Sequence, residues 1–128
     1  MPNATTLRIY FGVRPDQSIA EALEGLPRYC SESFKEHSEG SWNGEFQVSC
    51  PEAPELAAGD LVDDLAPYFP QLLRLKTFYD AVFEMQIAVG PPAPDIFVLE
   101  SNIVALLASL GTEIQINSNN HREKLDNA

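Results

Sequence analysis

The carboxylates Asp60, Asp63 and Asp64 are the tightest group of side chains in this sequence that could do chemistry. Carboxylates three or four residues apart on a helix share a face and can converge on a hard cation. No Asp-x-Asp calcium loop surrounds them, and no other carboxylate has a spacing that would complete such a site. We predict instead that Asp60 caps a helix, that the other two face water, and that the chain holds no metal. A metal-dependent enzyme that uses these three carboxylates is the third-ranked functional hypothesis, behind two binding roles.

The sequence also lacks the histidine, cysteine and serine patterns that support catalysis. His37 falls in a polar segment and His121 near the end of the chain, so a histidine-based acid–base or zinc site would need partners from elsewhere. Cys30 and Cys50 have no nearby histidine or basic cluster to lower a thiol pKa, and both are expected to be buried in strands. No Gly-x-Ser-x-Gly elbow, P-loop or dinucleotide-binding glycine pattern occurs. We therefore expect no catalytic residue, no enzyme activity and no cofactor.

Acidic residues are concentrated in one part of the 128-residue chain. The window 32–64 holds nine of the nineteen acidic residues and one basic residue, Lys35, which gives it a formal charge of −8 out of −11. A patch of one sign steers an oppositely charged surface toward it, whereas nucleic acid and anionic membranes require basic residues. The charge predicts a cationic protein as partner. The carboxylates expected to contact it are Glu32, Glu36, Glu39, Glu45, Asp60, Asp63 and Asp64.

Trp42 is the aromatic residue most closely associated with these carboxylates. It lies in Gly40-Ser41-Trp42-Asn43-Gly44, between residues that favour turns, and Glu32, Glu36, Glu39 and Glu45 surround it in the sequence. An aromatic anchor with a rim of carboxylates is suited to capturing arginine and lysine. Two alternatives stay open: Trp42 packs back onto the core, and the glutamates form an ordinary solvated face.

Apolar periodicity predicts one α+β domain over residues 1–117 and a polar tail over 118–128. We expect a mostly antiparallel sheet of about five strands with three to four helices packed on one face. Strands are expected at 6–13, 28–34, 45–50, 83–89 and 112–117, with a further extended run at 96–98. Helices are expected from Ser18 to a stop at Gly25 and Pro27, from 57 to a break at 68–70, over 71–80 and over 103–110. The segments 35–44 and 90–94 are expected to be loops.

Local signals support parts of this assignment. Ser18 and Glu21 have the spacing of a helix cap, and Gly111 provides the left-handed residue that commonly ends a helix. Ile114 and Ile116 of the last strand are expected to point into the core.

Several stretches resemble a broad group of small bacterial α+β domains of unknown function. They are the opening Leu7-Arg8-Ile9-Tyr10, Trp42 just before a strand, and Phe97-Val98-Leu99-Glu100 leading to the segment 106–116. Some members of that group are considered to be immunity proteins, encoded beside polymorphic or contact-delivered toxins. The group has no established catalytic motif. The resemblance implies a binding role, with a cognate toxin as the partner.

The leading expectation is thus a small cytoplasmic immunity protein that neutralises a cationic toxin domain by covering or distorting its active site. A cytoplasmic location is expected because the chain has no signal-peptide pattern and no apolar run long enough to span a membrane. The alternative is a homo-oligomeric structural or regulatory module that binds itself or a small molecule through the open face of its sheet. Arg8, Tyr10, Glu84 and Gln86 are expected to mark that face.

Overall fold

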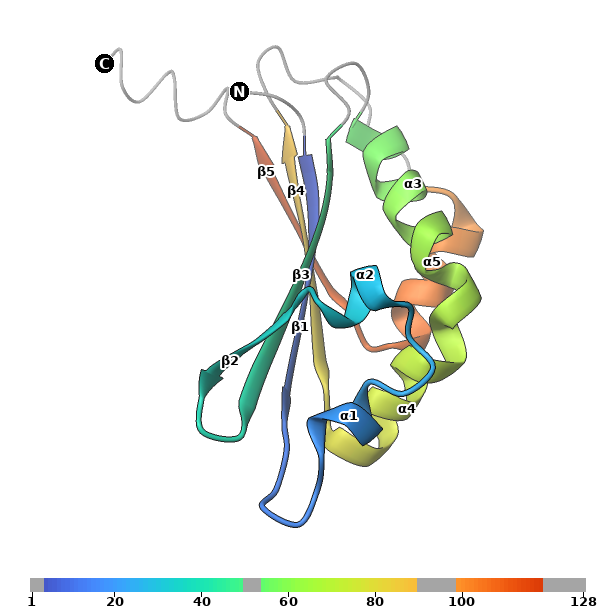
Figure 1. Ribbon diagram of the computed structural model, residues 1–128. Coiled ribbons are helices and arrows are strands. Elements are labelled where there is room, and N and C mark those ends of the chain that lie inside the picture. Colours follow the sequence, from blue (N-terminus) through green and yellow to red (C-terminus); the bar gives the residue numbers. More distant parts are fainter. Residues whose placement is uncertain (1–3, 50–53, 90–98, 119–128) are drawn as a thin grey trace, which may run out of the picture.

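The computed structural model describes residues 4–49, 54–89 and 99–118, which form one five-stranded sheet with helices on one face (Figure 1). The strands are β1 (Ala4–Gly12), β2 (Phe34–Ser38), β3 (Ser41–Ser49), β4 (Val82–Val89) and β5 (Glu113–Ser118). The helices are α1 (Ile19–Ala22), α2 (Arg28–Ser31), α3 (Pro54–Leu65), the 3₁₀ helix η1 (Ala66–Tyr68), α4 (Phe69–Tyr79) and α5 (Ser101–Ser109). The predicted α+β class is confirmed.

The strand order is β2-β3-β1-β4-β5. β1 pairs antiparallel with β3 and β4, and β3 pairs antiparallel with β2. β4 and β5 are parallel, so the sheet is mixed rather than purely antiparallel. A parallel pair needs a crossover, and the segment between these two strands supplies it with α5.

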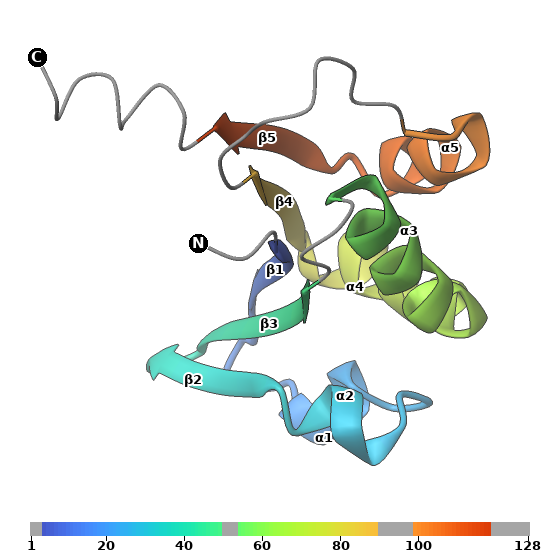
Figure 2. The same cartoon turned by 90° about the horizontal axis from the view of Figure 1, so that it is seen from above.

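The helices cover the sheet in sequence from one edge to the other. Figure 2 shows α1 and α2 near β2 and β3, α3 and α4 over the middle, and α5 beside β5. In β1, Leu7, Ile9 and Phe11 are buried on this side, while Arg8 and Tyr10 point to the opposite face. None of the described helices has the length and apolarity required to cross a membrane.

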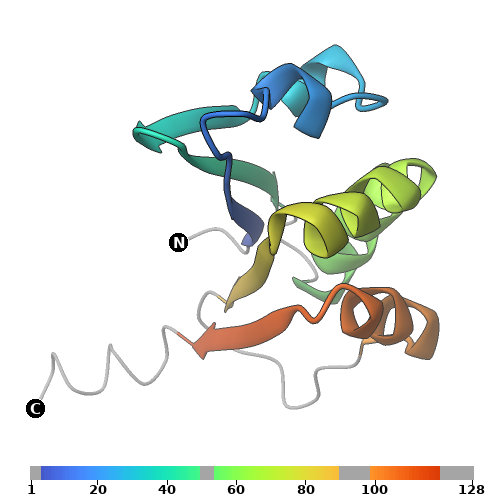
Figure 3. The same ribbon diagram turned by 90° about the horizontal axis from the view of Figure 1, so that it is seen from below.

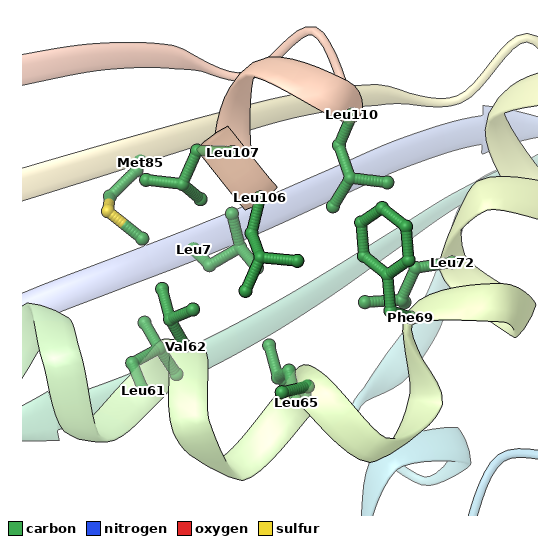
Figure 4. A pocket seen from close by; sticks show the side chains of 11 residues that line it. Leu7, Leu61, Val62, Leu65, Phe69, Leu72, Met85, Leu106, Leu107 and Leu110 are labelled. Atoms are coloured by element: carbon green, nitrogen blue, oxygen red, sulfur yellow. The ribbon is translucent and has the colours of Figure 1, made fainter. Parts of the chain in front are cut away.

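A small apolar pocket lies where α3, η1, α4 and α5 meet above the sheet (Figure 4). Its volume of about 20 Å³ has room for no more than a single water molecule. Because its lining is apolar throughout, such a space stays dry, and we interpret it as a packing gap in the core. The lining residues are Leu7, Leu61, Val62, Leu65, Ala66, Phe69, Leu72, Met85, Leu106, Leu107 and Leu110.

The strand predicted at 28–34 is wrong. Residues Arg28–Ser31 form the single-turn helix α2, in which the amides of Cys30 and Ser31 donate to the carbonyl oxygen of Pro27. Both a strand and a helical turn bury Cys30, so alternation over so few residues does not distinguish the two conformations.

The polar loop predicted at 35–44 is also wrong, because these residues form β2, a tight turn and the first part of β3. β2 is an edge strand in which only Phe34 is buried, and an edge strand exposed along its length shows no apolar alternation. Phe34 packs edge-to-face on Phe11 and Phe46, with ring centroids 5.6 and 5.9 Å apart. One aromatic side chain therefore anchors the hairpin to the core.

The helix boundaries agree better with the sequence. Ser18 Oγ accepts a hydrogen bond from the Glu21 amide at 3.2 Å, and Gly111 follows α5 with φ of 65°, as predicted. The break expected at 68–70 begins two residues earlier, as η1. The predicted cap at Asp60 is wrong, because α3 begins at Pro54 and Asp60 lies in its middle. A proline is well tolerated at a first helical position, where its missing N–H has no partner to lose.

Two expectations at the C-terminal end also need correction. Ile114 packs against the core, but Ile116 is 52% exposed because β5 is the outermost described strand. The strand predicted at 112–117 lies one residue later, at Glu113–Ser118. The expectations for Cys50, for the segments 90–94 and 96–98, and for the rest of the tail lie outside the described residues.

Gly44→Ala is expected to lower the free energy of unfolding by about 1–3 kcal/mol, as is usual for overpacking a core. A Cβ at residue 44 would lie 2.5 Å from Cε1 of Phe34, which the core holds in place. Urea denaturation measures the change.

Gly59→Ala is the matched control, because its Cβ would meet Ile103 Cδ1 at an ordinary 3.4 Å within α3. Alanine's higher helix propensity should stabilise this variant by about 0.5–1 kcal/mol. A Gly44→Ala protein as stable as the wild type would contradict the packing described for Phe34.

Candidate functional site

Three turns lie together at one end of the sheet, which Figure 3 shows from below. They are the β1–α1 connection, the turn at Glu39 and Gly40 between β2 and β3, and the turn at Asp80 between α4 and β4. The main-chain amide of Val13 donates to the carbonyl oxygen of Gly40 at 2.7 Å, which ties the first two turns together. Loops held in this way by a rigid sheet are common positions for binding residues.

A groove of about 420 Å³ lies between the β1–α1 connection and the β2–β3 hairpin. It brings together three of the residues predicted to bind a partner: Glu36, Glu39 and Trp42. We call it the hairpin groove. Its lining residues are Val13, Arg14, Pro15, Gln17, Ile19, Glu36, Glu39, Gly40 and Trp42.

The conformation of the hairpin follows from a few local interactions. Gly40 has φ of 79°, a left-handed value that glycine adopts without strain, and a Cβ there would lie 2.9 Å from the Val13 carbonyl oxygen. Its amide donates to Glu36 Oε2 at 3.3 Å, so one glutamate both closes the turn and borders the groove. On the other wall, the Arg14 amide donates to Gln17 Oε1 at 2.9 Å.

Trp42 lies in β3, not in a turn as predicted. Register places it opposite Phe11 of β1, and its half-buried side chain packs against the core while it borders the groove. The two alternatives left open by the sequence therefore combine: the indole is part of the core and part of the groove wall. Its conformation is held by packing before any ligand arrives.

The charges of the groove are mainly acidic. Glu36 and Glu39 are exposed on one wall, and Arg14 on the other lies 3.5 Å from Asp16. An ion pair this exposed contributes little to stability, so the Arg14 side chain is free to change partner.

A second groove of about 450 Å³ adjoins the first and shares five lining residues with it: Val13, Arg14, Gln17, Glu39 and Gly40. Among the residues that line only the second groove are Phe78, Tyr79 and Asp80, at the end of α4. Phe78 is 69% exposed, the largest such fraction among the exposed large apolar residues described. Sequence reasoning missed this residue. Its signal was present, because Phe78 falls outside the Leu72, Leu75, Tyr79 stripe that α4 turns toward the core.

The other predicted partner-binding residues do not join the groove. Glu45 lies on the open face of the sheet, where its Oε2 is 3.4 Å from Arg8 Nε. Glu32 pairs with Arg28 at 2.6 Å, one helical turn away. Asp60, Asp63 and Asp64 are exposed along α3. The eight residues predicted to bind a partner are thus spread over both faces of the sheet.

Metal binding and thiol chemistry receive no support from the geometry of these residues. Within the described parts of the chain, no three His, Cys, Asp or Glu side chains come close enough to hold a metal ion. Asp60, Asp63 and Asp64 accordingly do not converge. Burial raises the pKa of the Cys30 thiol above its usual value, and the nearby Asp64 carboxylate adds to the rise. A catalytic cysteine requires a lowered pKa.

The open face of the sheet is polar. Register places Arg8 between Glu45 and Glu84, and Tyr10 next to Asn43 and Val82. These side chains alternate with the buried ones, as the sequence predicted for Arg8, Tyr10, Glu84 and Gln86.

Comparison with known proteins does not identify a relative. No protein-family model matches the chain, and no characterised protein or solved structure gives a significant match to it. Any functional conclusion therefore depends on the residues and geometry described above.

In a Cys50→Ser background, Cys30 is expected to react with iodoacetamide roughly 100-fold more slowly in the folded protein than in denaturant, because alkylation requires local opening. Its side chain is 0% exposed. Since the thiolate is the reactive form and the pKa of Cys30 is raised, the folded-state rate should keep rising with pH beyond the usual thiol range. Equal rates in folded and denatured protein would contradict the burial of Cys30.

Proposed function

We propose that this chain is an acidic binding protein that recognises a cationic protein through the hairpin groove, and that it acts as an immunity protein against a toxin domain. The proposal rests on one observation: Glu36, Glu39 and Trp42 line the same groove. An aromatic face bordered by two carboxylates fits the guanidinium group of arginine or the ammonium group of lysine.

The groove suits a basic side chain in three respects. Glu36 and Glu39 present acceptors for charge-assisted hydrogen bonds, which are stronger than neutral ones. Trp42 offers a π-face and apolar area that would desolvate the bound cation. Because the core already holds Trp42 in place, binding would immobilise few side chains, and this reduces the entropic cost of association.

The remaining charges contribute to association at longer range. Glu32 and Glu45 are compensated locally by Arg28 and Arg8, so their net effect on an approaching partner is small. Asp60, Asp63 and Asp64 have no ion pair among the described residues, and they add to the field of a chain with net charge −11. Such a field accelerates the encounter with a basic surface and fixes its orientation.

Inhibition would follow from the shape of this end of the molecule. Many toxin domains act on nucleic acid or phosphate-bearing cofactors, which they bind in basic grooves. The three turns that project from the sheet would enter such a groove, with the carboxylates in the positions of phosphates. Phe78, exposed beside the hairpin groove, supplies an apolar contact at the same end.

The alternative of self-recognition through the open face is less well supported. A stable contact between sheet faces requires an apolar surface, and the described open face carries Arg8, Glu45, Glu84 and Gln86 near its centre.

The double variant Glu36→Lys/Glu39→Lys is expected to slow association with the toxin domain about tenfold or more, because charge steering acts mainly on the association rate. The proposal requires a toxin gene beside the gene for this chain, and the probe would be the basic domain which that neighbouring gene encodes. Surface plasmon resonance would measure its association at about 50 and about 300 mM NaCl, which differ in screening length.

The matched control is Asp60→Lys/Asp63→Lys, which changes the net charge by the same amount on α3. Its effect should be smaller and should disappear at the higher salt concentration. Equal slowing by both variants would reject the hairpin groove as the contact. Failure of the wild-type protein to bind this domain, or to restore growth of cells that express it, would reject the immunity role.

A further inference from the structure

The two edges of the sheet differ in how they are protected against pairing with another strand. At the β2 edge, the register shifts between Glu36 and Ser38, and Lys35, Glu36 and His37 are exposed. Bulges and charged side chains are the usual protection of an edge strand. At the other edge, β5 pairs with β4 in unbroken register over its whole length and has no partner on its outer side among the described strands.

The β5 edge also lies in the least charged part of the chain. The 18 residues from 101 to 118, which include α5 and β5, contain a single charged side chain, Glu113, and no proline. A chain of net charge −11 can associate with its own copy only where its carboxylates do not face each other. The edge formed by α5 and β5 meets that condition.

Apolar side chains are exposed along this edge. Ile116 of β5 is 52% exposed although its neighbour on β4, Ile87, is fully buried. Val104 of α5 is 43% exposed. In a helix it points about 160° away from Leu106, which faces α3 across the apolar pocket (Figure 4). Val104 therefore lies on the side of α5 away from α3. Figure 2 shows that this side of α5 is the one toward the outer edge of β5, the outermost described strand.

We propose that two copies of this chain pair antiparallel along β5, with the two-fold axis at Gln115, to form one continuous sheet. Residues that face each other across such a pair must point to the same side of the sheet, so their numbers must have the same parity. An axis at Gln115 places Ile114 opposite Ile116 of the second copy and covers the exposed isoleucine. It also places Glu113 opposite the uncharged Asn117, so no carboxylates face each other.

The proposed dimer does not depend on the proposed function. Salt should change the stability of the dimer and the affinity for a toxin in opposite directions. Two copies of net charge −11 repel each other, so salt should strengthen the dimer by screening that repulsion. Binding of a cationic toxin should weaken with salt. The hairpin groove and β5 lie at opposite edges of the sheet, so either can fail without the other.

Sedimentation velocity over a range of protein concentrations tests the dimer. Wild-type protein should dimerise more strongly at about 500 than at about 50 mM NaCl, and Ile116→Lys should be monomeric. Val82→Lys is the matched control, because Val82 is a strand residue of similar exposure, 55%, away from this edge. It adds the same charge and should leave dimerisation unchanged. A wild-type protein that stays monomeric under all conditions, or an Ile116→Lys protein that dimerises as well as the control, would overturn the proposal.

Cysteine cross-linking tests the register, again in a Cys50→Ser background. Gln115→Cys should form a disulfide between copies, because directly opposed residues in an antiparallel pair have Cα atoms about 4.5–5.5 Å apart. Asn117→Cys should not, because the two copies of residue 117 would be about 13 Å apart along the strands, beyond the reach of a disulfide. Cross-linking at 117 and not at 115 would reject this register and the axis at Gln115.

Discussion

The pleat of β1 determines which side chains of the neighbouring strands face the helices and which face the open side of the sheet. β1 is the central strand, and Leu7, Ile9 and Phe11 commit one of its faces to the core. Because neighbouring strands must keep the same pleat, the register then decides the side of every residue on β3 and β4. Trp42 falls opposite Phe11 and so lies on the helix side, whereas Glu45 falls opposite Arg8 on the open face.

This constraint divides the acidic window of the sequence into groups with different surroundings. Glu45 and Glu32 each lie beside an arginine, which compensates their charge locally. Glu36 and Glu39 lie at the hairpin, where Trp42 and the β1–α1 connection complete a groove. The carboxylates proposed to bind a partner are thus set apart from the others by the register of the sheet and by the position of a few arginines, not by their density in the sequence.

The two edges of the sheet, β2 and β5, also differ in the number of charged side chains that they carry. The β2 edge is charged, irregular and adjacent to the groove proposed to bind a cationic partner. The β5 edge is regular and almost uncharged, as expected for a surface that meets its own copy. A dimer formed there would leave both hairpin grooves accessible, since the grooves lie at the far ends of the combined sheet. Self-association and partner binding would therefore be compatible.

The α+β class, strands β1 and β4, helix α5 and the Ser18 cap could all be predicted from the sequence, because each has a periodic or capping pattern produced by contact with one core. The sequence did not reveal β2 or α2: an edge strand exposed along its length has no alternation, and a single helical turn has too few residues for a period. Nor did it show that Phe78 lines the second groove, or that Glu45 lies on the open face, apart from Glu36 and Glu39. Those outcomes depend on strand register and on turns that are distant in sequence but meet at one end of the sheet. Which side chains become neighbours there follows from the packing of the whole folded domain and has no local sequence signal.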